Sequence, residues 1–143
     1  MNLLIVEDNE SLRNALREGF NTLEGIDVIG SCKSGEEAIE YCLQRLPDVI
    51  LMDLQLAGAM NGIQAAIAIR KEYPRLPFVF YSIQDEDVFY RDFQRSGILS
   101  HYAYVRKSNY LLPVQLKPIL NDAIHGRSFI DPDIEQRVQE VRF

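Results

Sequence analysis

The sequence predicts an α/β fold in which one parallel β-sheet is covered by helices on both faces. Strand-like and helix-like stretches alternate five times along the 143 residues, a pattern typical of a parallel sheet whose strands are joined by helical crossovers. The strand-like stretches are almost continuously apolar, as expected of parallel strands buried on both faces. The length suits one domain with a full hydrophobic core.

Five stretches have the character of short buried strands. Most are uninterrupted apolar runs bounded by polar or turn-forming residues, whereas the second is β-branched and alternates weakly between apolar and polar residues. The predicted strands cover residues 2–6, 27–32, 48–52, 78–81 and 102–105.

Capping residues precede several of the helices expected between these strands. Asn9 or Ser11 can cap the first helix, and Ser34 followed by Glu37 matches a capping box for the second. Acidic residues in the first turn of the fourth helix interact favourably with the helix macrodipole and so stabilise its N-terminus. The predicted helices cover residues 9–23, 34–45, 62–73, 85–95 and 111–124.

Prolines and a glycine shape the predicted C-terminal part of the chain. Pro113 suits the first turn of the fifth helix, but Pro118 should kink that helix or delay its start. Gly126 can end the helix, and Asp131 followed by Pro132 can begin a short polar helix over residues 133–141.

Composition and charge narrow the classes of function. The net charge of −6 argues against this segment binding nucleic acid by itself, because such binding depends on clustered Lys and Arg. No apolar run approaches the roughly 20 residues that cross a membrane, and the N-terminus does not resemble a signal peptide. We therefore expect a cytoplasmic protein that has no membrane partner.

Polar residues stand at the carboxyl ends of four predicted strands. Glu7 and Asp8 follow the first strand, Asp53 follows the third, Ser82 follows the fourth and Lys107 closes the fifth. These ends share one edge of a parallel sheet, where ligands of such sheets bind. Each residue alone is more often a helix cap or a turn residue, but their joint occurrence favours a functional site.

The chemistry of this set points to a metal ion and phosphoryl transfer. Three neighbouring carboxylates repel one another unless cations neutralise them, and Lys107 supplies only one positive charge. Oxygen ligands without His or Cys favour Mg²⁺, with Mn²⁺ as the alternative. A carboxylate can accept a phosphoryl group as an acyl phosphate, while a cation and a hydroxyl stabilise its oxygens.

The same residues give the chain a resemblance to the receiver domain of two-component response regulators. The matching stretches are LLIVEDN, DVILMDLQL, the loop ending in NG, PFVFYS and YVRKS. The resemblance covers about residues 1–126 and implies a flavodoxin-like, five-stranded parallel sheet in the order 2-1-3-4-5.

The resemblance implies a role for each acidic residue. Asp53 matches the phosphoacceptor, Asp8 the direct Mg²⁺ ligand, and Glu7 the acid that reaches the metal through water. The backbone carbonyl of Gln55 matches the position that completes the metal shell. The implied phosphodonor is a cognate sensor histidine kinase.

The resemblance also implies a switch. Ser82 matches the hydroxyl residue that binds the phosphoryl group, Lys107 the lysine that pairs with it, and Tyr104 the aromatic residue that swings inward on activation. Homodimerisation on phosphorylation is a further expectation from the family. Such a receiver is not an enzyme on other substrates, because it catalyses only its own Mg²⁺-dependent phosphorylation and dephosphorylation.

Ile83 and Arg106 are among the residues that depart from the family pattern. Ile83 stands where the family usually has a small residue, and its side chain could narrow the access of phosphodonors. Arg106, immediately before Lys107, is unusual; it either adds positive charge near the site or points to solvent, and we favour solvent.

Residues 127–143 are predicted to form a linker with a short helix. The motif around Asp131 resembles the junction between receiver and output domain in LuxR/NarL-type regulators. We therefore expect DNA-binding transcription regulation through an output domain that is absent from this chain. The alternative is a stand-alone receiver that acts as a phosphorelay or docking module. An enzyme of the haloacid-dehalogenase kind is disfavoured, because Leu-Gln follows Asp53 where those enzymes have DxD.

Overall fold

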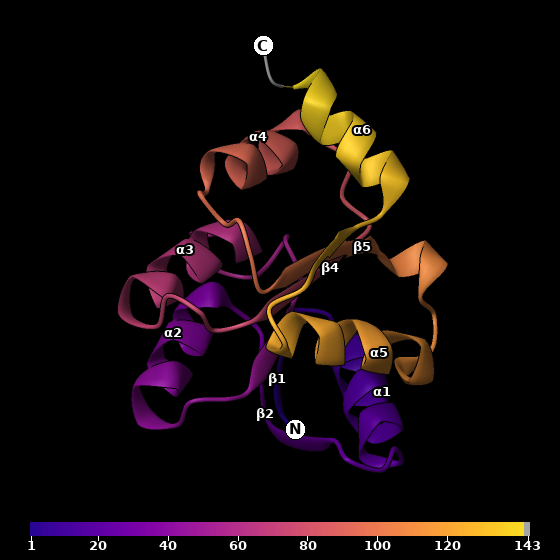
Figure 1. Ribbon diagram of the computed structural model, residues 1–143. Helices are drawn as coiled ribbons and strands as arrows, with labels where there is room; N and C mark the ends of the chain where they lie inside the picture. Colours follow the sequence, from indigo (N-terminus) through magenta and orange to yellow (C-terminus); the bar gives the residue numbers. More distant parts are fainter. Residues whose placement is uncertain (142–143) are drawn as a thin grey trace.

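A six-stranded parallel sheet lies at the centre of the computed structural model, which describes residues 1–141 (Figure 1). Its strand order is β2-β1-β3-β4-β5-β6. The predicted flavodoxin-like fold and the order of the first five strands are confirmed, but the expected number of strands was too small. The strands are β1 (Asn2–Val6), β2 (Asp27–Cys32), β3 (Val49–Met52), β4 (Phe78–Ser82), β5 (Tyr102–Arg106) and β6 (Ser128–Ile130).

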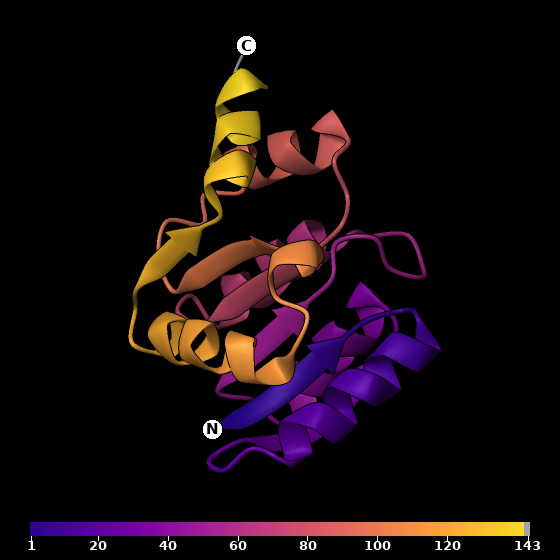
Figure 2. The same cartoon turned by 90° about the vertical axis from the view of Figure 1, so that its right-hand side faces the viewer.

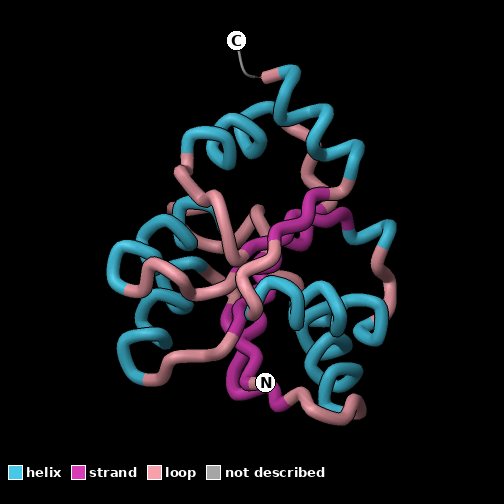
Figure 3. The backbone as a smooth tube through the Cα atoms, viewed as in Figure 1, coloured by secondary structure: helices cyan, strands magenta, loops and turns pink. Residues whose placement is uncertain are grey.

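Helices cover both faces of the sheet (Figure 3). The apolar sides of α1 and α5 close one core, whereas α2, α3 and α4 close the other. The helices are α1 (Glu10–Asn21), α2 (Gly35–Gln44), α3 (Gly62–Glu72), α4 (Asp87–Arg95), α5 (Pro113–Ile124) and α6 (Pro132–Glu140). Within residues 1–141, none of the helices is long and apolar enough to cross a membrane.

The predicted N-cap residues Asn9 and Ser34 cap α1 and α2. The Asn9 side chain accepts a hydrogen bond of 2.9 Å from the Leu12 backbone N–H and so caps α1. The Ser34 hydroxyl accepts one of 3.1 Å from Glu37 N–H at the start of α2. The Glu37 carboxylate, however, accepts from Lys33 N–H rather than from Ser34, so the capping box is only half formed.

Helices α4 and α5 each begin two residues later than predicted. Helix α4 begins at Asp87 and not at Asp85, and the Asp85 carboxylate accepts hydrogen bonds from the side chains of Tyr90 and Arg106. Helix α5 begins at Pro113 and continues through Pro118. Pro118 and Val114, whose carbonyl would accept the missing bond, are both exposed, so water can satisfy that carbonyl.

The C-terminal part of the chain adds to the sheet. Strand β6 pairs in parallel with β5, in the register Tyr102↔Ser128 to Tyr104↔Ile130. Helix α6 then packs against α4 and β5, and both views show it beside α4 (Figures 1 and 2). Ile134 of this helix and Val141, which follows its end, are buried in the core that α2, α3 and α4 close, so the helix is less polar in its contacts than its sequence suggests.

Candidate functional site

Glu7, Asp8, Asp53, Gln55 and Lys107 meet at the carboxyl edge of the sheet, whereas the predicted site residues Ser82 and Tyr104 do not line the groove found there. The groove measures about 490 Å³. The groove brings together side chains that follow β1, β3, β4 and β5, with one residue of α1. It is lined by Glu7, Asp8, Asn9, Leu12, Asp53, Gln55, Ile83, Gln84 and Lys107.

Lys107 ties two of the acids together. Its Nζ donates to Glu7 Oε1 at 2.6 Å and to Asp53 Oδ2 at 3.1 Å, and it lies 5.7 Å from the centre of the Tyr81 ring. The lysine is mostly buried, so both ion pairs are shielded from solvent. Opposite charges in such surroundings keep the ammonium protonated, and the pKa of Lys107 is raised although burial alone would lower it. Tyr81 was not among the predicted site residues.

Asp53 is held at the end of β3. It is only 7% exposed, and its Oδ1 accepts a hydrogen bond of 2.7 Å from the N–H of Leu54. Burial first, and then the negative charge of Glu7, raises the pKa of Asp53 to about 7 although Lys107 opposes this effect. Lys107 alone therefore does not provide enough positive charge to offset the cost of keeping the buried Asp53 carboxylate deprotonated beside Glu7.

Glu7 and Asp8 occupy different surroundings although they are neighbours. Glu7 is 2% exposed and accepts from Lys107 and, at 3.1 Å, from the Asn9 backbone N–H. Burial alone would raise the pKa of Glu7, but the hydrogen bonds and the charge of Lys107 outweigh it and lower that pKa. Asp8 is exposed at the groove, and partial burial and the charge of Glu7 raise its pKa.

The acidic cluster fits a hard divalent cation. One carboxylate oxygen from each of Glu7, Asp8 and Asp53 lies within 4.8 Å of the others. These oxygens, with water, match the preference of Mg²⁺ for oxygen ligands and few carboxylates. A second cation beside Lys107 would also offset the repulsion that raises the pKa of Asp53. Gln55 lines the same groove.

Ser82 and Tyr104 are buried, Ser82 at the end of β4 and Tyr104 in the core on the α4 side of β5. Ser82 is 1% exposed, and its Oγ accepts a hydrogen bond of 2.9 Å from Gln84 N–H. Tyr104 is also 1% exposed, with its ring packed among Phe80, Tyr90 and Phe93. The Tyr104 side chain thus already points inward in this structure.

Arg106 corrects the sequence interpretation. Its side chain points neither to the acidic groove nor to solvent, because it forms ion pairs with Asp133 and, at 3.1 Å, with Asp85. It also donates a hydrogen bond of 2.8 Å to the Tyr90 hydroxyl. Side chains alternate along a strand, so Arg106 shares the α4 side of β5 with Tyr104. The alternation of side chains along the strand could have predicted this direction of Arg106 from the sequence.

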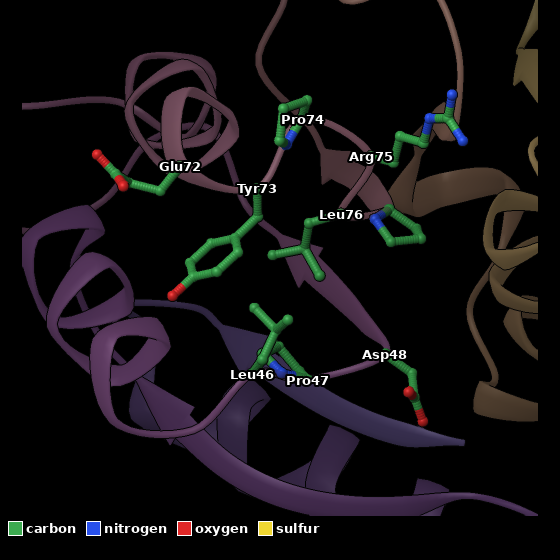
Figure 4. A pocket seen from close by; sticks show the side chains of 9 residues that line it. Leu46, Pro47, Asp48, Glu72, Tyr73, Pro74, Arg75 and Leu76 are labelled. Carbon is green, nitrogen blue, oxygen red and sulfur yellow. The ribbon is translucent and has the colours of Figure 1, made fainter.

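Another large groove lies at the opposite, amino edge of the sheet. It measures about 500 Å³ between the end of α2 and the loop before β4. Figure 4 shows the side chains of Leu46 and Leu76 pointing toward each other across it. Its lining is mainly apolar, and its acids Asp48 and Glu72 lie apart from the acidic cluster.

Comparisons with known proteins agree with this geometry. A family model described as the response regulator receiver domain matches residues 3–107. The response regulator UvrY of Escherichia coli (strain K12) is 24% identical over 138 residues, which are 96% of this chain and 61% of UvrY. The chain thus spans about three-fifths of the length of such curated relatives.

Solved structures give the same fold. A two-component response regulator of the LuxR family from Aurantimonas sp. SI85-9A1 is similar with a TM-score of 0.81 and 26% identity, over 99% of this chain and 96% of that one. The RcsB response regulator of Salmonella typhimurium, from a study of conformational dynamism for DNA interaction, has a TM-score of 0.76 at 18% identity. That match covers 97% of this chain and 67% of RcsB and supports the fold alone.

Proposed function

This chain belongs to the response regulator receiver domain family, and on that premise we propose that Asp53 is its phosphoacceptor. The observation that supports this most is the position of Asp53 at the floor of the groove, with one oxygen on Lys107 and the other on a backbone N–H. A carboxylate fixed in this way is positioned to attack a phosphorus atom that enters the groove.

The reaction is a transfer from a histidine kinase. A carboxylate oxygen of Asp53 forms the new P–O bond while the P–N bond of the kinase phosphohistidine breaks, and the imidazole leaves with the electron pair and takes up a proton. Lys107 lies against Asp53 Oδ2 and offsets the negative charge on the transferred oxygens. Its ion pair with Glu7 keeps the ammonium in place during the step.

Glu7, Asp8 and Asp53 are the side chains that would hold Mg²⁺, and the Gln55 carbonyl is the proposed backbone ligand. Mg²⁺ held by these residues would supply positive charge to the phosphoryl oxygens in the transition state. The exposed Asp8 is the proposed direct ligand, and the buried, lysine-paired Glu7 the water-mediated one. Mn²⁺ could replace Mg²⁺.

The response to phosphorylation begins at Ser82. The new group carries a charge of about −1.5 to −2 and accepts hydrogen bonds strongly, so it attracts the Ser82 hydroxyl. In this structure Ser82 Oγ accepts a hydrogen bond from Gln84 N–H. On phosphorylation Ser82 Oγ would turn away from that N–H toward the phosphoryl group. Ser82 and Tyr104 are the proposed switch residues. Since Tyr104 is already inside, the first change falls on the segment that joins β4 to α4.

We place the receiver domain in residues 1–126 and the junction with an output region in residues 127–143. This proposal is supported by the lengths of the relatives, because UvrY is longer than the matched segment. The proposed output is DNA binding for transcription regulation, with homodimerisation on phosphorylation; RcsB, which is similar in fold, has been solved as dimers bound to DNA. A stand-alone receiver in a phosphorelay remains the alternative, and the net charge of −6 suits either role.

Acetyl phosphate with Mg²⁺ tests the proposed chemistry. Intact mass spectrometry should show the gain of one phosphoryl group, and Asp53→Asn should abolish that gain. Asp27→Asn is the matched control, because Asp27 is an exposed acid at the opposite edge of the sheet and should not matter. A gain that persists in Asp53→Asn, or no gain with any small phosphodonor, would contradict the proposal.

A further inference from the structure

Tyr81 lies beneath the edge of the sheet that carries the acidic groove. It precedes Ser82 in β4, so its side chain points to the other face of the sheet, where it is 4% exposed in the core that α1 and α5 close. Tyr81 pairs with Val105 of β5, and alternation places Lys107, two residues on, on the same face. Tyr81 is not one of the residues that line the groove. Any effect of Tyr81 on the groove must therefore pass through a neighbouring residue.

The ring of Tyr81 faces the ammonium group of Lys107. Lys107 Nζ lies 5.7 Å from the centre of the ring, within the roughly 6 Å over which an aromatic face attracts a cation. The Lys107 side chain is only 14% exposed, so water screens this attraction little. Since the ammonium also donates to Glu7 and Asp53, the ring is its third contact and the only one of these three without a charge.

The hydroxyl of Tyr81 fastens the turn that begins with Lys107. Residues Lys107–Asn109 form a short 3₁₀ helix, which a 3.2 Å hydrogen bond from Tyr110 N–H to the Lys107 carbonyl closes. The carbonyl of Tyr110 accepts a hydrogen bond of 2.6 Å from the Tyr81 hydroxyl. Tyr81 thus supports Lys107 in two places, with its ring at the ammonium and with its hydroxyl at the end of the turn.

A neutral support suits a lysine that must change partners. The flexible four-carbon stem of a lysine allows many rotamers, and holding the ammonium in one place costs conformational entropy. When Asp53 becomes an acyl phosphate, the ammonium loses a carboxylate partner and must pair with phosphoryl oxygens. A further carboxylate beside Lys107 would compete with those oxygens for the ammonium, whereas the Tyr81 ring attracts it without adding negative charge.

We propose that Tyr81 is a positioning residue that presents the Lys107 ammonium to the phosphoryl group on Asp53. The ring holds the ammonium within reach of the groove while its partner changes from the Asp53 carboxylate to the phosphoryl oxygens. The hydroxyl holds the turn from which the lysine side chain extends. This inference rests on the proposed phosphoacceptor function.

The rate of phosphorylation by acetyl phosphate at saturating Mg²⁺, followed by intact mass, tests the role of the ring. Tyr81→Leu and Tyr81→Met remove the ring and should each slow the reaction about five-fold, the size of one shielded contact between a cation and a ring. Tyr81→Phe keeps the ring and should retain most of the native rate. The Mg²⁺ concentration that gives half the maximal rate should not rise in these variants, because Tyr81 does not line the groove.

A second substitution at Lys107 separates positioning from a general structural effect. In the Lys107→Ala background, Tyr81→Leu should cause no further loss, because the contact through which it acts is already gone. The affinity for beryllofluoride with Mg²⁺, a stable stand-in for the phosphoryl group, should show the same pattern in the native sequence, the two single variants and the double variant. A merely structural role of Tyr81 would instead cause the same fold-loss in both backgrounds.

Tyr41→Leu is the matched control. The Tyr41 hydroxyl also donates to a backbone carbonyl, that of Ile29 at 2.8 Å, but Tyr41 lies on α2, away from Lys107. Its rate should equal the native one. A native rate in Tyr81→Leu and Tyr81→Met, an equal loss in Tyr81→Phe, or an undiminished loss in the Lys107→Ala background overturns the positioning role alone. No phosphoryl gain in the native sequence, or a gain that persists in Asp53→Asn, overturns the phosphoacceptor proposal and the positioning role with it.

Discussion

Replacing Tyr104 by Phe should stabilise the protein. The substitution removes only the buried hydroxyl, which has no partner among residues 1–141, and keeps the ring contacts with Phe80, Tyr90 and Phe93. An unsatisfied buried polar group costs about 1–3 kcal/mol. We expect Tyr104→Phe to raise the free energy of unfolding by about 1–2 kcal/mol, which corresponds to a rise in Tm of about 4 °C per kcal/mol.

Tyr90→Phe is the matched comparison, because its hydroxyl donates to Asp85 at 2.6 Å and accepts from Arg106 at 2.8 Å. This change should lower the free energy of unfolding by about 1 kcal/mol. Urea unfolding followed by circular dichroism measures both variants. If Tyr104→Phe were as stable as the native sequence or less stable, the Tyr104 hydroxyl would have a partner, and the conclusion that it is buried without one would be wrong.

Three further predictions concern the groove and the loop beside it. Ile83→Ala should speed phosphorylation by acetyl phosphate, because this 66% exposed side chain lines the groove and narrows the access of the phosphodonor. Leu43→Ala, a similarly exposed control on α2, should leave the rate unchanged, and an unchanged or slower rate for Ile83→Ala would refute the idea. Mg²⁺ affinity should fall as the pH is lowered through about 7, because a proton then competes for Asp53; equal affinities by calorimetry on both sides of neutrality would contradict this. Asn61→Ala should lower the free energy of unfolding in urea by about 1 kcal/mol, because it removes the capping box that Asn61 forms with Gln64 at α3; no loss would show that the cap is unimportant.

The elements that position the site could be predicted from local sequence. The apolar runs of β1, β3 and β4 are buried throughout, apart from the partly exposed Asn2 at the start of β1. The polar residues that follow these strands mark the carboxyl edge, because parallel strands end together there. Asn9 and Ser34 cap the helices expected of them, since an N-cap depends on residues only three positions apart.

The packing of β6 and α6 could not be predicted in the same way. Strand β6 has only three residues, and what fixes it is pairing with β5, about 26 positions earlier in the chain. The contacts of Arg137 with Asp85 and Asp87 span some 50 positions and depend on the final packing of α6 on α4. The direction of the Arg106 side chain could have been predicted, because alternation along β5 places it on the same side as Tyr104, which faces α4.

Locating the phosphoryl group on the chain tests the central claim most directly. After reaction with acetyl phosphate and Mg²⁺, hydride reduction converts an aspartyl phosphate to homoserine, which peptide mass mapping detects. The site geometry predicts homoserine at Asp53, which lies between Lys107 and the Leu54 N–H. Homoserine at Asp8 instead, the longer alcohol that reduction forms from a glutamyl phosphate at Glu7, or no reduced acid in the groove would contradict it.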